Sequence, residues 1–339
     1  MKKDKLSNYT RGWFLGKFEP SLAYTDYEVG LRWNQKGDAE PRHFHKETTE
    51  YVAFAGGKHR LGDEIFTDGE MCTIRPYMST DYECLEPGYC LTVKSVSKPK
   101  DKYLGSPVTL AIPMAGKGQR FIDAGYKTPK PFIKVLGVPM INRVIENFTP
   151  DAAHRFILVT REGVNPRVKN GQVVQLDFET QGAVSTMFEV EHLIGRDDPL
   201  LIANCDQLIS GFDVDDFMNK SADCSVTTFT CDNPHHSYVK EVKGLVTEVA
   251  EKKVISNTAV SGVYFYRKAK YYFDAAHRMV EKDIRVNGEF YNSPVFNEII
   301  ADGLKVNTYH IDGKRQHILG TPQELKDFYK KLKSGKVVL

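Results

Sequence analysis

The sequence predicts a two-part protein, in which a small all-β barrel precedes a larger, Rossmann-like α/β domain. Three observations predict it. Short alternating runs separated by turn residues fill residues 1–97, a polar stretch containing a proline occupies residues 98–107, and continuous apolar runs alternate with helical spacing from residue 108 onward. We therefore expect domains at 1–97 and 108–339, joined by a linker at 98–107.

The first part reads as strands at residues 23–29, 51–55 and 90–96, and Gly-containing turn sequences lie between them. Many short strands at this spacing, with no long helical pattern, indicate a small β-barrel or jelly roll.

The second part begins with the apolar run Val108–Met114, which is typical of a buried parallel strand. Residues 139–148 have helical spacing, and further strands are expected at 156–160 and 199–204. This alternation of strands with a helix favours a parallel α/β sheet.

Composition excludes several classes of protein. Hydrophobic residues make up 41% and charged residues 27%, as in ordinary soluble globular proteins, and a net charge of +2 gives no reason to expect a nucleic-acid or membrane partner. The N-terminus lacks the apolar core of a signal peptide, no apolar run is long enough to span a bilayer, and none of the six cysteines lies in a C-x-x-C pair. We expect reduced thiols and a cytoplasmic location.

The strongest motif follows the first apolar strand. Its two glycines allow close backbone approach to a ligand, and Arg120 and Lys130, the latter between two prolines, offer fixed positive charge to phosphate oxygens. A dinucleotide G-x-G-x-x-G fails at Phe121, and a P-loop lacks its Gly-Lys-Ser/Thr. The predicted loop comprises Met114, Ala115, Gly116, Lys117, Gly118, Gln119 and Arg120.

With Pro129-Lys130-Pro131-Phe132 and Gly137-Val138-Pro139, this loop resembles the sugar-phosphate nucleotidyltransferases, also called nucleoside-diphosphate-sugar pyrophosphorylases. That family includes cytidylyltransferases acting on phosphocholine-like substrates. The resemblance reaches about Phe328 and implies a glycosyltransferase-A-like mixed sheet. It assigns Arg120 and the loop to the triphosphate, Lys130 to the transferring phosphate, and Gln181 and Gly182 to the base.

Asp206 follows the strand at 199–204, where α/β proteins bind ligands, and it suits Mg²⁺. It also matches the family's metal-binding aspartate. The family often adds a second aspartate before a late Gly-Thr-Pro, but Ile318 or Leu319 stands at that place. Either another residue, with Glu298 and Asp312 as candidates, supplies the second ligand, or one carboxylate suffices.

The resemblance places Lys252 at the acceptor's phosphate, as a fourth catalytic residue beside Arg120, Lys130 and Asp206. It places Glu251 at a polar group of the acceptor, and Asn292 in an acceptor-side loop.

In the first part, the spacing of Gly37, His43, His45, Glu50 and Gly57 resembles the first motif of the cupins. Two histidines two residues apart on a strand share one face, and with a carboxylate they make a candidate transition-metal site. The fourth ligand is either Asp81 or missing. Such a domain could be a tailoring enzyme, a sugar sensor or a dimerisation unit.

The favoured function is transfer of a nucleoside monophosphate from a nucleoside triphosphate, CTP or UTP by preference, to a sugar 1-phosphate with release of pyrophosphate, for capsule or surface polysaccharide. One alternative is a CTP-dependent enzyme for a non-sugar phosphate such as phosphocholine. Another is a non-catalytic nucleotide- or sugar-binding regulator. A homo-oligomer is compatible with each.

Overall fold

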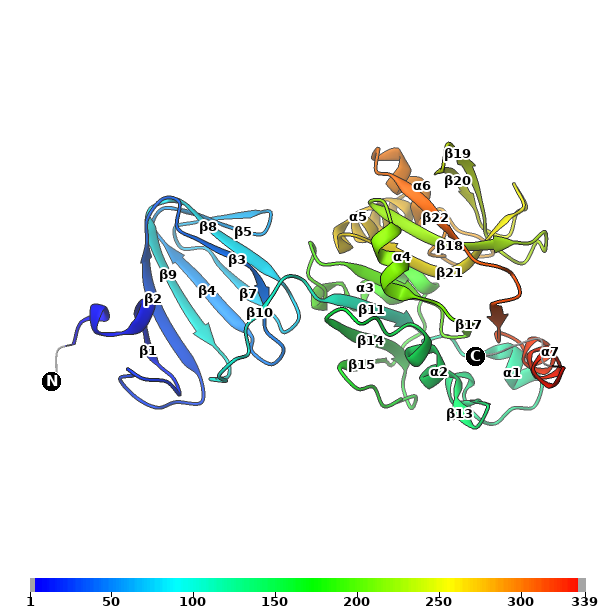
Figure 1. Ribbon diagram of the computed structural model, residues 1–339, viewed down its shortest axis with the longest axis horizontal. Coiled ribbons are helices and arrows are strands. Elements are labelled where there is room, and N and C mark those ends of the chain that lie inside the picture. The colour runs from blue at the N-terminus through cyan, green and yellow to red at the C-terminus, as the bar shows by residue number, and fades with distance from the viewer. Residues whose placement is uncertain (1–3, 335–339) are drawn as a thin grey trace. The chain divides into compact units, whose positions relative to one another are not determined.

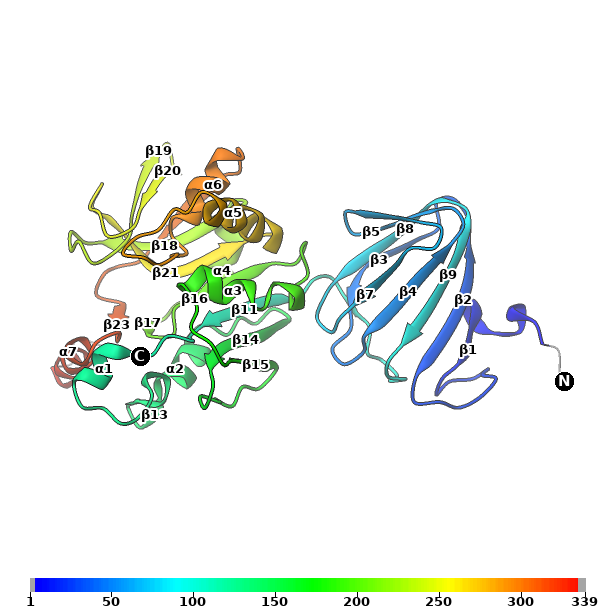
Figure 2. The ribbon, with the colours of Figure 1, turned by 180° about the vertical axis from the view of Figure 1, so that it is seen from behind.

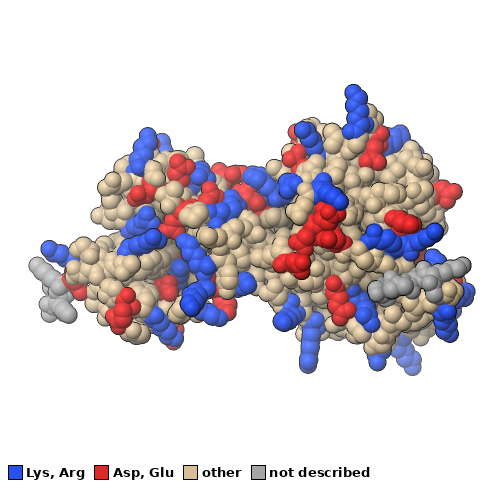
Figure 3. Space-filling model, in the orientation of Figure 1, with Lys and Arg blue, Asp and Glu red and all other residues tan. Residues whose placement is uncertain are grey.

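The computed structural model describes residues 4–334, which form two compact units. The first contains the described residues up to Pro107 together with Leu193–Asp198, and the second contains Val108–His192 and the described residues from Pro199 onward. Each unit has its own apolar core. On the face seen in Figure 3, basic and acidic side chains intermingle, as the near-neutral net charge predicts.

The first unit consists of two five-stranded antiparallel sheets (Figure 1). Its core joins Val52 and Cys90 of one sheet to Leu61 of the other. Two short 3₁₀ turns, Leu6–Asn8 and Thr10–Gly12, precede the strands. The first sheet has the order β1 (Trp13–Leu15), β2 (Glu28–Asn34), β9 (Gly88–Lys94), β4 (Glu50–Ala55) and β7 (Met71–Ile74). The second has the order β10 (Tyr103–Leu104), β3 (Ala39–Phe44), β8 (Thr80–Glu86), β5 (Lys58–Leu61) and β6 (Glu64–Thr67).

Two expectations differ from this structure. Residues 23–29 are not a strand: Ala23 makes an isolated bridge to Leu15, and regular pairing starts only at Glu28. The expected linker at 98–107 is part of the first unit, because β10 pairs with β3 and the buried Asp101 carboxylate accepts backbone N–H groups of Lys46, Glu47 and Thr48 at 3.0–3.2 Å. A buried carboxylate with three donors fixes that segment.

The second unit is built on one mixed sheet. β15, β14, β11 and β16 are parallel, as the apolar runs predict, whereas β21 runs antiparallel to both of its neighbours, β16 and β18. The order is β15 (Gly171–Leu176), β14 (His154–Arg161), β11 (Val108–Pro113), β16 (Leu200–Ala203), β21 (Thr258–Tyr266), β18 (Cys224–Thr230) and β22 (Val306–His310), with the hairpin β19 (Tyr238–Val242) and β20 (Leu245–Ala250) attached to β21.

The expected helix at 139–148 is α2 (Met140–Asn147), which buries Met140, Ile141 and Val144. Figures 1 and 2 both show α1 (Gln119–Asp123) beside α7 (Pro322–Lys333). No helix within 4–334 is both long and apolar enough to cross a membrane. The remaining elements are α3 (Ala183–Phe188), α4 (Val214–Lys220), α5 (Ala269–Glu281), α6 (Val295–Ala301), the 3₁₀ turns Lys130–Phe132 and Glu191–Leu193, and two small ladders, β12 (Lys134–Val135) with β13 (Val138–Pro139) and β17 (Gln207–Ile209) with β23 (Gln316–Ile318).

Candidate active site

The glycine loop begins where the buried strand β11 ends, and it packs on Lys130. Gly118 has a φ of +69°, a conformation that L side chains rarely adopt. A Cβ atom at this position would lie 3.0 Å from the Cβ of Lys130. Gly118 is therefore required both by its backbone conformation and by the close approach of Lys130.

Lys130 and Asp206 form the centre of the site. The Lys130 Nζ donates to Asp206 Oδ2 at 2.5 Å, and both side chains are largely buried. Burial disfavours the ammonium, but the adjacent Asp206 carboxylate raises the pKa of Lys130 above its ordinary value. Lys130 thus stays charged at neutral pH. Burial also raises the pKa of the neighbouring Cys205 thiol to about 11, so this thiol is neutral.

Arg120 is exposed and has no hydrogen bond or ion pair to any residue in the described part of the chain. Its charge acts on Lys130 and on Tyr291, where it opposes the other influences that raise the pKa of each group. The structure therefore brings Gly118, Arg120, Lys130 and Asp206 into one neighbourhood and leaves the Arg120 guanidinium available to an anion.

A second carboxylate, which the sequence reasoning missed, lies beside Asp206. Leu319 donates its N–H to the backbone carbonyl of Asp206 at 2.8 Å, next to the β17–β23 ladder. A Cβ atom on Gly320 would lie 2.8 Å from Asp206 Oδ2 and 3.4 Å from Glu324 Oε2. Both acids therefore flank the same glycine, and Glu324 Oε2 is a buried atom without a hydrogen-bond partner.

The two candidates proposed for this role are engaged elsewhere. Glu298 pairs with Lys282 at 2.7 Å and with Arg278 at 3.8 Å, and Asp312 accepts the backbone N–H of Lys314. The only sequence signal for Glu324 is its position three residues after Thr321, whose side chain accepts the Glu324 N–H as the N-cap of α7. That pattern alone reads as a capping box.

On the expected acceptor side, Lys252 contacts Tyr291. The Lys252 Nζ donates to the Tyr291 hydroxyl at 2.5 Å and lies 4.4 Å from the ring centre. Burial raises the pKa of Glu251, with a further contribution from Glu289, and the Glu251 carboxylate accepts the Ser237 hydroxyl. The sequence reasoning did not single out Tyr291, although it lies in the expected loop.

The other candidate residues have contacts of their own. Asn292 is buried and its Oδ1 accepts the Tyr272 hydroxyl at 2.8 Å, so its amide N–H groups are what remain for a ligand. Gln181 Oε1 accepts from Arg285 at 2.8 Å, and a Cβ on Gly182 would lie 2.5 Å from the carbonyl oxygen of Phe290. No hydrogen bond or ion pair between residues 4 and 334 links Gln181 or Gly182 to Lys130 or Asp206. Lys117 pairs with Glu179 at the surface, and the Gln119 amide donates to Asp123.

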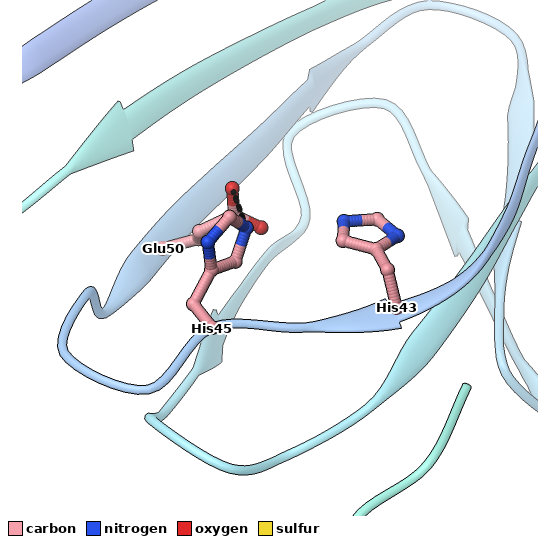
Figure 4. Close-up of side chains that lie close together, drawn as sticks. All are labelled: His43, His45 and Glu50. Atoms are coloured by element: carbon pink, nitrogen blue, oxygen red, sulfur yellow. Dashed lines mark ion pairs between the residues drawn. The ribbon is translucent and has the colours of Figure 1, made fainter. Parts of the chain in front are cut away.

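A second cluster lies in the first unit. His43 at the end of β3, His45 just after it and Glu50 at the start of β4 are buried, and their ligand atoms lie within 4.8 Å of one another (Figure 4). The His43 Nδ1 lies 2.9 Å from the Pro41 carbonyl oxygen, to which it donates, so its Nε2 is left with a lone pair. Burial disfavours the Glu50 carboxylate, but His45 at 3.3 Å and Lys94 at 3.5 Å hold its pKa at about 2.

Asp81 does not complete this cluster. Its two carboxylate oxygens accept from Arg42 and Arg60, each at 2.9 Å. The sequence left two possibilities, Asp81 as the fourth ligand or no fourth ligand, and the structure excludes Asp81. Within residues 4–334 the group has three ligands, which is the number that leaves a coordination position open.

The second unit is similar to proteins of known structure and to one family model. Residues 110–258 match the family model of the MobA-like NTP transferase domain. Among solved structures, the nucleoside-diphosphate-sugar pyrophosphorylase of Vibrio cholerae RC9 is 24% identical with a TM-score of 0.57, over 65% of this chain and 99% of that one. The inositol-1-phosphate CTP transferase of T. maritima is 16% identical with a TM-score of 0.52, over 69% and 98%. A UDP-glucose pyrophosphorylase complexed with UDP-glucose is 17% identical with a TM-score of 0.54, over 66% and 99%.

At these identities the solved structures show the fold, and the match to the family model covers residues 110–258 of the 339. No curated protein is significantly similar to the chain. Apart from Leu193–Asp198, the family model matches residues of the second unit, so the cupin resemblance of the first unit rests on its own motif spacing and two-sheet architecture.

Proposed function

We propose that this chain transfers a nucleoside monophosphate from a nucleoside triphosphate to a phosphorylated small molecule and releases pyrophosphate, because residues 110–258 match the family model of an NTP transferase domain. The observation that carries this proposal is the Lys130–Asp206 ion pair beneath Gly118, with the unpaired Arg120 beside it. Lys130 supplies a fixed cation, Asp206 a carboxylate that can bind a metal, and Arg120 a free guanidinium. A site for a triphosphate needs all three groups.

In the reaction, an oxygen of the acceptor's phosphate attacks the α-phosphorus, a new P–O bond forms, and the bond to the β-phosphate oxygen breaks as pyrophosphate leaves. A phosphate monoester is already anionic at neutral pH, so the protein needs no general base. Arg120 binds the triphosphate and Lys130 stabilises the charge that develops on the transferring phosphate. Lys252, oriented by Tyr291, holds the acceptor's phosphate.

Mg²⁺ fits the acidic pair around Gly320. The orphaned Oε2 of Glu324 and the carboxylate of Asp206 provide the one or two carboxylate ligands that Mg²⁺ prefers. When bound, the ion would neutralise phosphate charge.

A sugar 1-phosphate is the favoured acceptor, with UTP or CTP as donor, because two of the similar solved structures are sugar-nucleotide pyrophosphorylases. Such a product would serve surface polysaccharide synthesis. The second candidate is CTP-dependent transfer to a non-sugar phosphate such as an alcohol or choline phosphate. Two observations favour it: the similarity to an inositol-1-phosphate CTP transferase, and the departure from the usual late aspartate, where Ile318 or Leu319 stands.

The test is pyrophosphate release from each of the four common nucleoside triphosphates against a panel of sugar 1-phosphates, inositol 1-phosphate and phosphocholine. One pair should react in the presence of Mg²⁺. Lys130→Ala and Asp206→Ala should each lose roughly 10²–10³ in turnover, about 3–4 kcal/mol of transition-state stabilisation. Lys134→Ala, at an exposed lysine nearby in the sequence, is the matched control. Release by no pair, or near-normal turnover in either variant, would overturn the proposal.

In the first unit, we propose that His43, His45 and Glu50 hold a transition-metal ion. The support is that the ligand atoms of these three buried residues lie within 4.8 Å of one another, with the His45 Nε2 at 3.3 Å from Glu50 Oε1.

A further inference from the structure

The first unit contains a cavity that the nucleotidyl transfer does not use. Its volume is about 250 Å³, and its lining residues come from both sheets, for example Val52 on β4 and Leu61 on β5. This space equals that of about eight liquid water molecules. It lies below the ~300–1,000 Å³ typical of sites for drug-sized ligands, so its ligand is smaller than a nucleotide.

One cationic side chain of the cavity lining has no partner. Four cationic side chains line the cavity, and three of them are paired: Arg32 and Lys102 contact Glu40 at 3.1 and 2.6 Å, and Lys94 lies 3.5 Å from Glu50 and 3.6 Å from Glu28. The fourth cation, Arg11, is exposed and has no partner among residues 4–334. An anion entering the cavity would therefore meet a guanidinium that breaks no existing contact to bind it.

A buried acceptor in the same lining also lacks a partner. Asn34 is 1% exposed, and its Nδ2 donates to the carbonyl oxygen of Arg32, but its Oδ1 accepts from no group in the described chain. A buried acceptor left unpaired costs about 1–3 kcal/mol, so such atoms in native proteins usually face a ligand or water. Trp13 and Tyr82 provide ring surfaces in the lining.

From these three features we propose that the first unit binds a small organic anion in this cavity. Arg11 and the neighbouring cations hold its carboxylate or phosphate, a hydroxyl of the ligand donates to Asn34, and its body packs on Trp13. The matching chemical class is a hydroxylated metabolite bearing one such anionic group, and a sugar acid and a sugar phosphate are the two sources of this chemistry. His43 and Glu50 of the metal-competent cluster line the same cavity.

The test is calorimetric titration of the full chain with gluconate, glucose 1-phosphate and neutral glucose. Gluconate or glucose 1-phosphate should bind saturably, and glucose should not. Arg11→Ala should weaken binding roughly tenfold or more, as expected when one charged hydrogen bond is lost. Arg75→Ala, an exposed arginine of the same unit that does not line the cavity, should leave binding unchanged. Because Arg11 has no partner, its removal leaves the fold intact, and a melting curve checks this.

Lys252→Ala distinguishes this site from the second unit, where a sugar phosphate is also expected to bind. Binding kept in Lys252→Ala and lost in Arg11→Ala supports the proposal, even if the chain transfers no nucleotide. Binding lost in Lys252→Ala and kept in Arg11→Ala overturns it. The absence of saturable binding of both anions at millimolar concentration overturns it as well. Binding of gluconate alone, or of glucose 1-phosphate alone, would show whether the anionic group is a carboxylate or a phosphate.

Discussion

The two acids that flank Gly320, Asp206 and Glu324, differ in their partners. Asp206 is bonded to Lys130, whereas Glu324 Oε2 has no partner. A buried carboxylate oxygen without a partner is costly unless a cation joins it, so the Glu324 Oε2 suits a divalent ion.

We predict that Glu324→Gln raises the Mg²⁺ concentration needed for half-maximal turnover roughly tenfold or more, since one charged ligand is removed. Turnover at saturating Mg²⁺ should fall less than in Asp206→Ala. Asp327→Asn, at a half-buried position one turn later in α7 whose carboxylate pairs with Lys330, is the control. An unchanged Mg²⁺ requirement in Glu324→Gln would exclude this residue from the metal site.

We predict that Gly118→Ala loses most of its turnover, because an alanine would be strained at a φ of +69° and its methyl group would press on Lys130 at 3.0 Å. Gly116→Ala is the matched comparison, since its φ is not in the left-handed region and its added Cβ meets nothing within 4 Å. The melting temperature and turnover should both fall more in Gly118→Ala. Equal effects in the two variants would contradict the packing argument.

At this scale, the sequence predicted the residues whose chemistry is local. Arg120, Lys130 and Asp206 lie next to a buried strand or between prolines, and such contexts fix where a side chain points. Glu324 could not be predicted, because its place beside Asp206 depends on the pairing of β17 with β23, which brings together residues that are distant in sequence.

Among the elements, β23 and α7 position that second carboxylate, and their packing includes a buried histidine. His317 is 4% exposed, its Nε2 lies 2.7 Å from the Ser210 hydroxyl, and its ring packs on Phe328. Burial, with a smaller contribution from Lys331, lowers the pKa of His317 to about 4. The folded state therefore holds this ring neutral.

We predict that His317 makes the protein less stable as pH falls from about 6.5 to about 4. In that window the unfolded chain binds a proton that the folded chain does not, so the free energy of unfolding falls by about 3 kcal/mol in total. His317→Gln removes this dependence, and its stability deficit relative to wild type should shrink as pH is lowered. Urea unfolding at several pH values measures it, with the exposed His192→Gln as control. A constant deficit would contradict the prediction.

The sequence predicted elements well where burial on both faces produces a continuous apolar run, as in β11, β14 and β16. It failed where tertiary pairing decides. The alternation at 23–29 suits a strand, yet β2 begins at Glu28 because pairing with β9 starts there. The polar residues 98–107 look like a linker, but Asp101 and β10 bind them to β3 and its following turn.

For the molecule as a whole, two units with separate cores mean that the proposed metal cluster and the proposed nucleotidyl-transfer site lie in different units. The segment Leu193–Asp198 shows that the units are not simply consecutive in the chain, since it belongs to the first unit although both flanking segments belong to the second. Within the first unit, Asp198 Oδ2 accepts the backbone N–H of Ser79 at 3.0 Å. No local pattern in the sequence predicts that Leu193–Asp198 belongs to the first unit.

We predict that Ni²⁺ stabilises the first unit through His43, His45 and Glu50, because imidazole nitrogen suits this ion. At a hundredfold excess over its dissociation constant the ion adds about 2.7 kcal/mol. Calorimetry of the full chain, in Ni²⁺ and in EDTA, should show a higher unfolding temperature that is lost in His43→Ala and in Glu50→Gln. His192→Ala in the second unit should keep the Ni²⁺ shift. Because the cluster and the Asp206 site belong to separate units, His43→Ala should retain Mg²⁺-dependent pyrophosphate release. An equal Ni²⁺ shift in wild type and His43→Ala would show that the ion binds elsewhere.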